Sequence, residues 1–456
     1  MRYYSTNGKS EKDSFKDVLF QGLAGDKGLF MPSSLPTLTH QQIFDFREKD
    51  YAEIAFEVLS ALLGDEIGEN DLRFICEDAY DFEVPLEQVY GRNFLLRLDR
   101  GPTASFKDFA ARAMARMMQH FLKWTNESLT ILTATSGDTG GAVANAFLGL
   151  ENIRVIVLFP EKEVTGVQRK QMTTLGGNVN AVAVRGKFDD CQQIVKDAFV
   201  DPGLAYLNLT SANSINLGRL FPQSVYYFYA YSRTAKEKGE EVIFSVPSGN
   251  FGNLCGGTIA KKMGLPVKKF IAAVNENDEF PKFLETGSYE KVSPSKECIS
   301  NAMNVGHPSN LARLIEFYGG NMSDKGEMRK APDLGLMRKE IYSQSVSDGE
   351  TRDTIKVANT KHGVLLEPHG AVGWKALEDY LKKTGKEESE TAAISFETAH
   401  PAKFPEEIRS LLSIDPGLPD SLREVVSKEE DFETIEPDKE SFKELLKQSK
   451  YHKFYV

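Results

Sequence analysis

The spacing of apolar residues changes near residue 93. Before that point apolar positions recur at helical intervals, most clearly over 51–64, and we expect a mainly helical N-terminal domain over residues 1–92. Beyond it, short β-rich apolar runs alternate with helical stretches. The runs cover 94–98, 129–134, 154–159, 182–186, 241–246, 269–275 and 392–397, and the helical stretches cover 106–121, 139–150, 189–199 and 219–236. This alternation predicts parallel sheets covered by helices, an α/β architecture.

Two segments depart from the alternation. Residues 284–350 are rich in Ser, Gly and Lys and poorly periodic, which predicts a loop-bearing insertion or an interdomain region. Residues 406–456 are charged and helical, which is typical of a solvated helical face. We therefore expect a core over 93–405 and a separate C-terminal helical segment over 406–456.

Charge and composition narrow the functional classes. The 456 residues include 55 Lys plus Arg against 66 Asp plus Glu, a net charge of -11, and no basic run long enough for a phosphate-binding stripe, so we expect no nucleic-acid partner. The four cysteines form no CxxC pair, so we expect neither a metal site nor disulfides. Without a signal-type or membrane-spanning apolar stretch, the sequence predicts a soluble cytoplasmic protein that binds small molecules or proteins.

A Gly- and Asn-rich turn over 247–257 follows one predicted strand and precedes a helix. Such a turn exposes backbone N–H groups at a helix N-terminus, where a phosphate is favoured. The turn lacks the Lys-Ser/Thr ending of a P-loop, and its glycine spacing differs from GxGxxG. A plain strand-to-helix turn is an equally good interpretation of this segment alone.

A second turn of this kind lies in TATSGDTGGAVANAF, residues 133–147. The hydroxyls of Thr135, Ser136 and Thr139 and the accessible N–H groups beside its glycines suit a carboxylate or a phosphate. The alternative is that Asp138 or Thr139 only caps the helix. Two such turns indicate a ligand with two anionic ends, or a cofactor phosphate together with an anionic substrate.

Lys107 lies at the predicted entrance of a helix, directly after a Gly-Pro turn. A helix N-terminus disfavours a cation, and a neutral amine is what Schiff-base chemistry needs. The common alternative for any lysine is a solvated surface position.

Long motifs give the chain a family resemblance. GPTASFKDFAAR, TATSGDTGGAVANAF, SANSINLGRL, SVPSGNFGNLCGG, FIAAVNEND, EPHGAV and TAHPAKF occur in this order, after an opening DSFKDVLFQGLAGDKGLFMPSSLP. Together they resemble threonine synthases of the bacterial and fungal type. The resemblance spans nearly the whole chain and is weaker over 284–350 and beyond about residue 405.

The resemblance implies a tryptophan-synthase-β-like fold, with two parallel-sheet α/β subdomains over 93–405, and the cofactor pyridoxal 5'-phosphate. Lys107 corresponds to the Schiff-base lysine, and Thr398 to the hydroxyl partner of the pyridine nitrogen. Asp138 would face the phenolic edge of the cofactor. The cradle of the cofactor phosphate corresponds to Gly249, Asn250, Phe251, Gly252 and Asn253.

Candidate substrate contacts also follow from the resemblance. Thr135, Ser136 and Thr139 would hold the substrate carboxylate, and the candidates for its phosphate are Ser211, Asn213, Asn216 and Arg219. A surface helix position is an equally good interpretation of Arg219. His369 is expected to be a loop residue beside the cofactor ring and not a catalytic group.

The implied enzyme is a carbon–oxygen lyase acting on phosphates in threonine biosynthesis. It would convert O-phospho-L-homoserine and water into L-threonine and phosphate, through an aldimine at Lys107, γ-elimination and β-addition of water. One alternative is a pyridoxal-phosphate phospho-lyase that releases a 2-oxo acid, ammonia and phosphate. Another is a non-catalytic metabolite-binding module that uses the same turns. The sequence does not indicate an oligomeric state.

Overall fold

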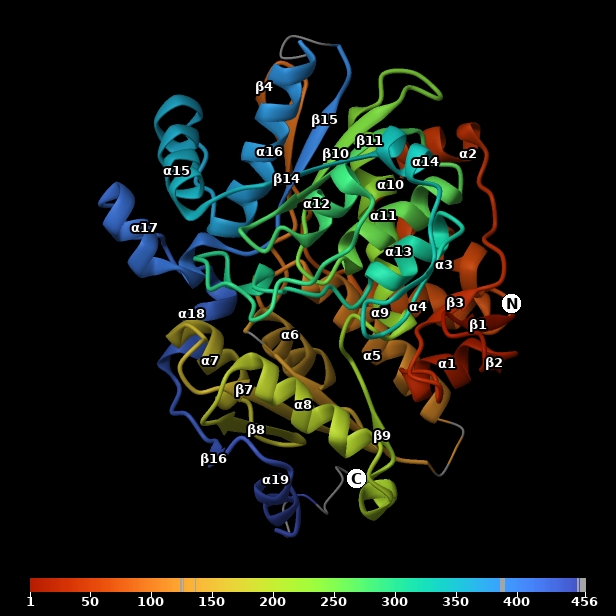
Figure 1. Cartoon of the computed structure of the whole chain (residues 1–456), viewed down its shortest axis with the longest axis vertical. Coiled ribbons are helices and arrows are strands. Elements are labelled where there is room, and N and C mark those ends of the chain that lie inside the picture. Colours follow the sequence, from red (N-terminus) through yellow and green to blue (C-terminus); the bar gives the residue numbers. More distant parts are fainter. Residues whose placement is uncertain (124, 126, 136, 386–389, 449–450, 452–456) are drawn as a thin grey trace.

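Two mainly parallel sheets organise the chain (Figure 1). The computed structural model describes all residues except 124, 126, 136, 386–389, 449–450 and 452–456. The larger sheet lies in the upper half of Figure 1 and the smaller sheet in the lower half. This arrangement confirms the predicted α/β core with two sheets. Among the described residues, no helix combines the length and the apolar character needed to cross a bilayer.

The larger sheet has six strands, and the first five in spatial order are parallel. In that order they are β14 (Ile341–Ser345), β11 (Val267–Val274), β10 (Val242–Pro247), β15 (Ala393–Glu397), β5 (Asn93–Arg97) and β4 (Leu86–Tyr90), with β4 antiparallel to β5. Helices cover both faces, so the central strands β10 and β15 are buried at every position instead of alternating between buried and exposed residues. One face packs on α16 (Pro368–Thr384), and the other on α10 (Pro222–Thr234) and α11 (Gly252–Lys262).

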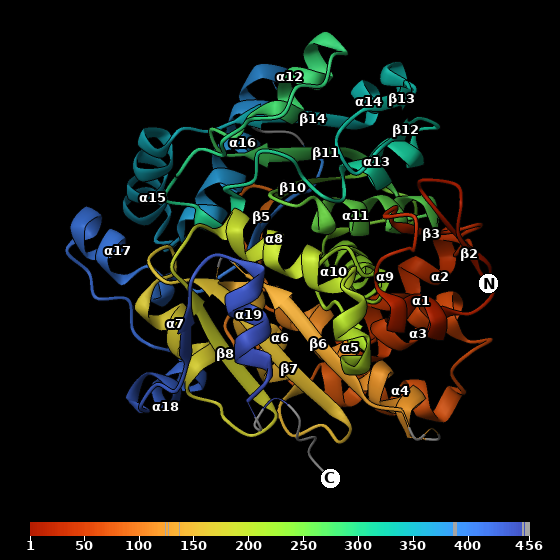
Figure 2. The same ribbon diagram turned by 60° about the horizontal axis from the view of Figure 1, so that its bottom comes forward.

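The smaller sheet is wholly parallel. Its order is β16 (Glu433–Ile435), β8 (Val179–Val184), β7 (Ile153–Pro160), β6 (Leu129–Ala134) and β9 (Leu209–Thr210). Successive residues of β7 point to opposite faces: Val155 and Val157 join the main core, whereas Ile156 and Leu158 join a second cluster. The first face packs on α6 (Asp138–Phe147) and α7 (Gly166–Thr173). The second packs on α8 (Phe188–Phe199) and α19 (Lys439–Leu446), which lie in front of the sheet in Figure 2.

The N-terminal region wraps around one side of this core. It contains α1 (Phe15–Gln21), α2 (His40–Asp45), the 3-10 turn η1 (Phe46–Glu48), α3 (Tyr51–Leu63), α4 (Glu69–Ala79) and an antiparallel sheet of β2 (Glu11–Lys12), β1 (Tyr3–Ser5) and β3 (Phe30–Pro32). The predicted helix over 51–64 is confirmed, but the small sheet was not predicted. Residue 92, the expected boundary, lies in the turn between β4 and β5, so the larger sheet already includes part of the N-terminal segment.

The segment 284–350, expected to be a loop-bearing insertion or an interdomain region, contributes β14 to the larger sheet. It follows α12 (Glu279–Thr286) and contains η3 (Asn301–Met303), α13 (Leu311–Phe317), β12 (Asn321–Met322), β13 (Met328–Lys330), α14 (Leu334–Glu340), β14 and the start of α15 (Asp348–His362). The sequence of β14, IYSQS, escaped prediction because an edge strand is partly exposed and carries polar residues.

The C-terminal segment crosses from the larger subdomain to the smaller one. After η4 (Pro401–Lys403), α17 (Pro405–Leu412) packs on α15, α18 (Asp420–Ser427) packs on α7, and β16 then pairs with β8. The segment expected to be helical thus contains one strand in addition to its helices. The strand has only three residues, and its pairing partner lies some 250 positions earlier in the sequence, so no local pattern marks it.

Helices α10 and α11 approach closely because glycines line their contact. A Cβ on Gly257 would lie 2.6 Å from Cζ of Tyr227 and 2.8 Å from Cε1 of Phe270. Both rings are fully buried, and the Tyr227 hydroxyl donates to Oδ1 of Asn253 at 2.7 Å. Neither ring can move without opening the packing around the start of α11.

We predict that Gly257→Ala lowers the free energy of unfolding by about 1–3 kcal/mol, because the added methyl group overpacks a rigid aromatic contact. Urea-induced unfolding monitored by circular dichroism measures this change. Gly349→Ala is the matched control, since its Cβ would meet nothing closer than 3.9 Å within α15, and it should be neutral or stabilising. Equal stabilities of the two variants would contradict the packing argument.

Candidate active site

The four segments that carry the predicted site all follow carboxyl ends of parallel strands. Lys107 comes after β5, Asp138 after β6, Gly249 after β10 and Thr398 directly after β15. Parallel α/β sheets place ligands at this end of their strands. The segments that sequence analysis singled out therefore lie at the end of each sheet where its parallel strands have their carboxyl ends.

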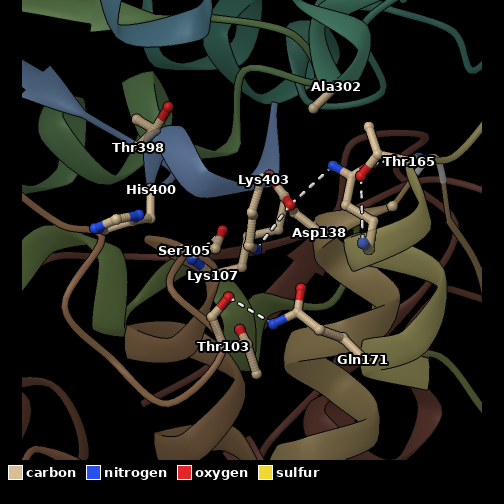
Figure 3. A network of polar contacts seen from close by, with 12 residues as sticks. Thr103, Ser105, Lys107, Asp138, Thr165, Gln171, Ala302, Thr398, His400 and Lys403 are labelled. Carbon is tan, nitrogen blue, oxygen red and sulfur yellow. Dashed lines mark hydrogen bonds and ion pairs between the residues drawn. The ribbon is translucent and has the colours of Figure 1, made fainter. Parts of the chain in front are cut away.

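Two lysines meet at one carboxylate where the subdomains join (Figure 3). Nζ of Lys107 lies 3.9 Å from Oδ2 of Asp138, and Nζ of Lys403 lies 2.9 Å from Oδ1. The Lys403 side chain is fully buried, and that of Asp138 is 2% exposed. Nε2 of Gln168 also donates to Oδ1 of Asp138, at 3.0 Å. Asp138 is thus a buried carboxylate held by groups on three sides.

Burial controls the protonation of these groups. It lowers the pKa of Lys107 to about 8; attraction to Asp138 opposes this shift, and repulsion from Lys403 and Arg219 adds to it. Burial raises the pKa of Asp138, but the two lysines outweigh burial and hold it well below its usual range. At neutral pH the site thus contains an ionised carboxylate and a lysine that loses its proton unusually easily.

The loop before Lys107 is built around Asp108. Its carboxylate accepts the backbone N–H of Thr103 at 2.9 Å and the Thr103 hydroxyl at 2.6 Å. A Cβ on Gly101 would lie 2.5 Å from Oδ2 of Asp108, so the close turn requires glycine there. Helix α5 (Lys107–Leu122) then begins at Lys107, which confirms the predicted position of this lysine at a helix entrance.

The predicted phosphate cradle is a tight turn into α11. Phe251 has φ 60° and ends the turn, and α11 begins at Gly252 with no side-chain cap among the described residues. A Cβ on Gly249 would lie 2.7 Å from the carbonyl oxygen of Ala302. The first N–H groups of the helix have no partner within it, so they are available to an anion.

Two asparagines hold the cradle in place. Oδ1 of Asn250 accepts the N–H and the hydroxyl of Ser309, at 3.3 and 3.1 Å. Oδ1 of Asn253 accepts the hydroxyls of Tyr226 and Tyr227, each at 2.7 Å. The buried Nδ2 of Asn253 has no hydrogen-bond partner within the described part of the chain.

Thr398 lies beside an acidic group that sequence analysis missed. Its hydroxyl donates to Oε1 of Glu367 at 3.3 Å, and this fully buried carboxylate also accepts the backbone N–H groups of His369 and Gly370. Nδ1 of His369 lies 2.5 Å from Oε2 of Glu367, and its Nε2 accepts the N–H of Ala302. His369 is the second residue of α16, and both nitrogen atoms of its ring have hydrogen-bond partners.

Glu397 forms a second buried carboxyl group directly before Thr398. Its Oε1 accepts the backbone N–H of Glu367 at 2.7 Å. Burial, and then the neighbouring Glu367, raise the pKa of Glu397 well above its usual range, although Arg97 opposes them. A strand-end Glu gives no sequence signal of its own, because its burial arises from the packing of α16 on the sheet.

Three of the candidates for binding the substrate phosphate are Arg219, Asn213 and Ser211. Arg219 is buried, which rules out the surface interpretation, and its Nη1 donates to the carbonyl of Ala212 at 2.7 Å while its Nε has no partner among the described residues. Burial lowers the pKa of Arg219 to about 10, so it remains charged at neutral pH. Asn213 bonds to Thr133 and to the Ala134 carbonyl, and Oγ of Ser211 accepts the Asn213 N–H.

The side chains of two expected substrate contacts are hydrogen-bonded within the protein. Asn216 caps α9 (Leu217–Leu220) by accepting the Gly218 N–H, and its Nδ2 donates to the carbonyls of Leu19 and Ser211. Its amide has no donor left for a ligand. The hydroxyl of Thr135 is likewise occupied, because it bonds to the backbone of Gly137 and Gly140. Both side chains shape turns.

The remaining hydroxyl candidates lie nearby. Thr139 is half-buried in the first turn of α6. Ser136 lies outside the described residues.

Comparisons with known proteins agree across the chain. A family described as pyridoxal-phosphate dependent enzyme matches residues 84–396, and families described as threonine synthase N terminus and threonine synthase, C-terminal match residues 2–80 and 370–446. A threonine synthase from Haemophilus influenzae is 42% identical over 92% of this chain and 94% of its own length. One from Escherichia coli is 40% identical over 93% and 94%.

A solved structure provides the corresponding three-dimensional match. PLP-bound threonine synthase from Brucella melitensis superposes with a TM-score of 0.89 at 36% identity, over 99% of both chains. The correspondence therefore covers the N-terminal region, the core and the C-terminal segment of the chain.

We predict that Glu397 makes stability depend on pH. Because its pKa is raised in the folded state, the folded protein keeps a proton that the unfolded chain releases above about pH 4.5. Its contribution to the free energy of unfolding falls as pH rises, by at most about 1.4 kcal/mol per pH unit. Urea unfolding at about pH 5.5, 7 and 8.5 should show a steeper decline for the unsubstituted chain than for Glu397→Gln.

Glu406→Gln, at an exposed position of α17, is the matched control and should keep the original pH dependence. Parallel pH profiles for Glu397→Gln and the unsubstituted chain would show that Glu397 is ionised in the fold.

Proposed function

Because the chain belongs to the threonine synthase family of pyridoxal-phosphate-dependent enzymes, we propose that it converts O-phospho-L-homoserine and water into L-threonine and phosphate. The observation that carries this proposal is the largely buried Lys107, whose pKa lies near 8 at a helix entrance beside Asp138. A lysine in this state offers the neutral amine that Schiff-base chemistry requires. The small-molecule substrate follows from the family.

The residues present fit pyridoxal phosphate. The turn at Gly249 leaves no room for a Cβ, and among the described residues no side chain caps the start of α11, so its first backbone N–H groups are available to a phosphate. We propose that Lys107 binds the cofactor covalently, that Asp138 and Thr398 contact its ring, and that the turn Gly249, Asn250, Phe251, Gly252 and Asn253 holds its phosphate. When bound, this cofactor withdraws electrons and so acidifies the Cα and Cβ hydrogens of an amino acid.

In this proposal Lys107 carries protons between substrate atoms. Near pH 8 a substantial fraction of its amine is neutral, so it can remove the Cα proton and later return one. Loss of a Cβ proton and breakage of the Cγ–O bond release the phosphate. Cγ then gains a proton, and water adds at Cβ. Asp138 stays ionised throughout, and Thr398 offers the ring nitrogen a hydroxyl instead of a carboxylate.

Buried cations and helix ends provide the sites for the two anionic ends of the substrate. We place Arg219, Ser211 and Asn213 near the substrate phosphate and Thr139 near its carboxylate. Arg219 remains charged, and its Nε, which has no hydrogen-bond partner in the described part of the chain, is a suitable donor for a phosphate oxygen. The near-complete burial of Asp138 and Lys403 restricts the access of bulk solvent to this side of the site.

We also propose that the core contains the active site and that the two flanking segments support it structurally. The core over 93–405 contains every group named above, and the segment 1–92 supports it, because α1 and α4 pack on α5. The segment 406–456 ties the two sheets together through β16 and α18.

We predict that the purified protein forms threonine and phosphate from O-phospho-L-homoserine. Amino-acid analysis, phosphate release and a 2-oxo-acid assay on the same reaction distinguish this outcome from the phospho-lyase alternative. Ammonia and 2-oxobutyrate without threonine would overturn the synthase assignment. Lys107→Ala should lose both the visible absorbance of the bound cofactor and the activity, whereas a colourless, inactive unsubstituted protein would favour a binding module.

We predict that Arg219→Gln raises the KM for O-phospho-L-homoserine by about 10- to 100-fold, because a charged hydrogen bond to phosphate contributes about 1.5–3 kcal/mol. Steady-state kinetics measure this change, and inhibition by inorganic phosphate should weaken in parallel. Arg169→Gln, which removes a surface pair with Glu430, is the matched control and should leave both quantities unchanged. A folded Arg219→Gln protein with unaltered phosphate inhibition would place the substrate phosphate elsewhere.

A further inference from the structure

Lys403 has no role in the proposed reaction, yet it is among the most deeply buried charged residues of the described chain. It lies in η4, five residues after Thr398, between Ala402 and Phe404. Its side chain is fully buried, and its Nζ lies 2.9 Å from Oδ1 of Asp138. An ammonium group is kept in such a place only if its ion pair compensates for the loss of water.

The geometry divides one carboxylate unequally between two lysines. Lys403 contacts Asp138 at hydrogen-bond distance, whereas Lys107 lies 3.9 Å from the other oxygen. Gln168 donates to the same oxygen as Lys403 and accepts a hydrogen bond from Asn301 at 3.3 Å. Oδ1 of Asp138 is therefore held by Lys403 and Gln168, whereas Oδ2 lies toward Lys107.

The other charged groups around Lys107 cannot replace this pairing. Asp108 and Glu367 are the nearby carboxyl groups, but Asp108 is bonded to Thr103, and Glu367 to Thr398, His369 and Gly370. Arg219 adds a further positive charge. His369 lies close enough to influence the pKa of Asp138, and its ring is held by Glu367 and Ala302. Asp138 is thus the carboxylate that both lysines share.

We propose that Lys403 is a positioning residue that holds Asp138 in an ion pair and so makes the neighbouring Lys107 ammonium group easier to deprotonate. A carboxylate alone beside Lys107 would stabilise its ammonium form and suppress its nucleophilicity. A second, closer cation occupies that carboxylate and repels a proton on Lys107. The inference rests on the proposed function only in taking Lys107 as the reacting amine.

The pH dependence of Lys107 acetylation tests this role. The full-length chain, freed of bound cofactor, is treated with trace acetic anhydride between about pH 6 and 11, and the Lys107 peptide is quantified by mass spectrometry. The unsubstituted protein should show a midpoint near 8. Lys403→Gln should raise the midpoint by about one to three pH units, because Lys107 becomes the main partner of Asp138. Asp138→Asn should lower it, because Lys403 then repels an ammonium that has lost its partner.

Controls separate charge from structure. Lys403→Arg keeps the charge and should keep the midpoint within about half a unit of the original. Lys375→Gln removes a lysine paired with Asp379 on α16 and should leave the midpoint unchanged. Circular dichroism verifies that each variant is folded. An unchanged or lowered midpoint in folded Lys403→Gln, or a raised one in Asp138→Asn, would overturn the proposal.

A separate readout isolates the proposed function. Borohydride reduction after addition of pyridoxal phosphate should attach the cofactor to Lys107, as peptide mass analysis would show. Attachment to another lysine would refute the reacting role of Lys107, while the acetylation midpoint would still report whether Lys403 controls its charge.

Discussion

The buried ion pair between Asp138 and Lys403 is the constraint on which the rest of the site depends. Asp138 begins α6 on the smaller sheet, and Lys403 follows β15 of the larger sheet. Neither charge can be left without the other, because an unpaired buried ion costs several kcal/mol. The two sheets must therefore meet with the ends of β6 and β15 facing each other, and this fixes the surroundings of Lys107 as well.

Local cations and backbone donors determine which ligands the site accepts, and the net charge of -11 does not. Surface charges are screened over about 8 Å at physiological salt. Within the site Lys107, Lys403 and Arg219 lie among buried groups, and α11 directs its N-terminal N–H groups outward. An acidic protein can thus bind phosphate esters while its surface repels polyanions.

Sequence patterns predicted the central strands, because buried parallel strands appear as mostly apolar runs. They also predicted the position of Lys107 at the start of a helix, because a helix start has a local sequence signature. They missed β14 and β16, which are short edge strands paired with distant segments. The family motif around Thr398 contained Lys403, but no local property distinguishes a lysine that will be buried. Glu367 and Glu397 escaped notice for the same reason, since tertiary packing alone brings them together. Asn216 and Thr135 illustrate a different limit of sequence motifs. A motif does not show whether a polar side chain faces a ligand or forms its hydrogen bonds with nearby backbone groups, as these two do.

The late position of β16 bears on the synthesis of the protein. The other strands of the smaller sheet lie between residues 129 and 210, but the strand that covers the edge of β8 is 433–435. A nascent chain forms its early segments first, so the backbone groups of β8 along that edge remain unpaired until residues 433–435 have been made. An open strand edge is a template for pairing with other chains. The interval before the C-terminal segment arrives is therefore the stage at which newly made molecules are most exposed to aggregation.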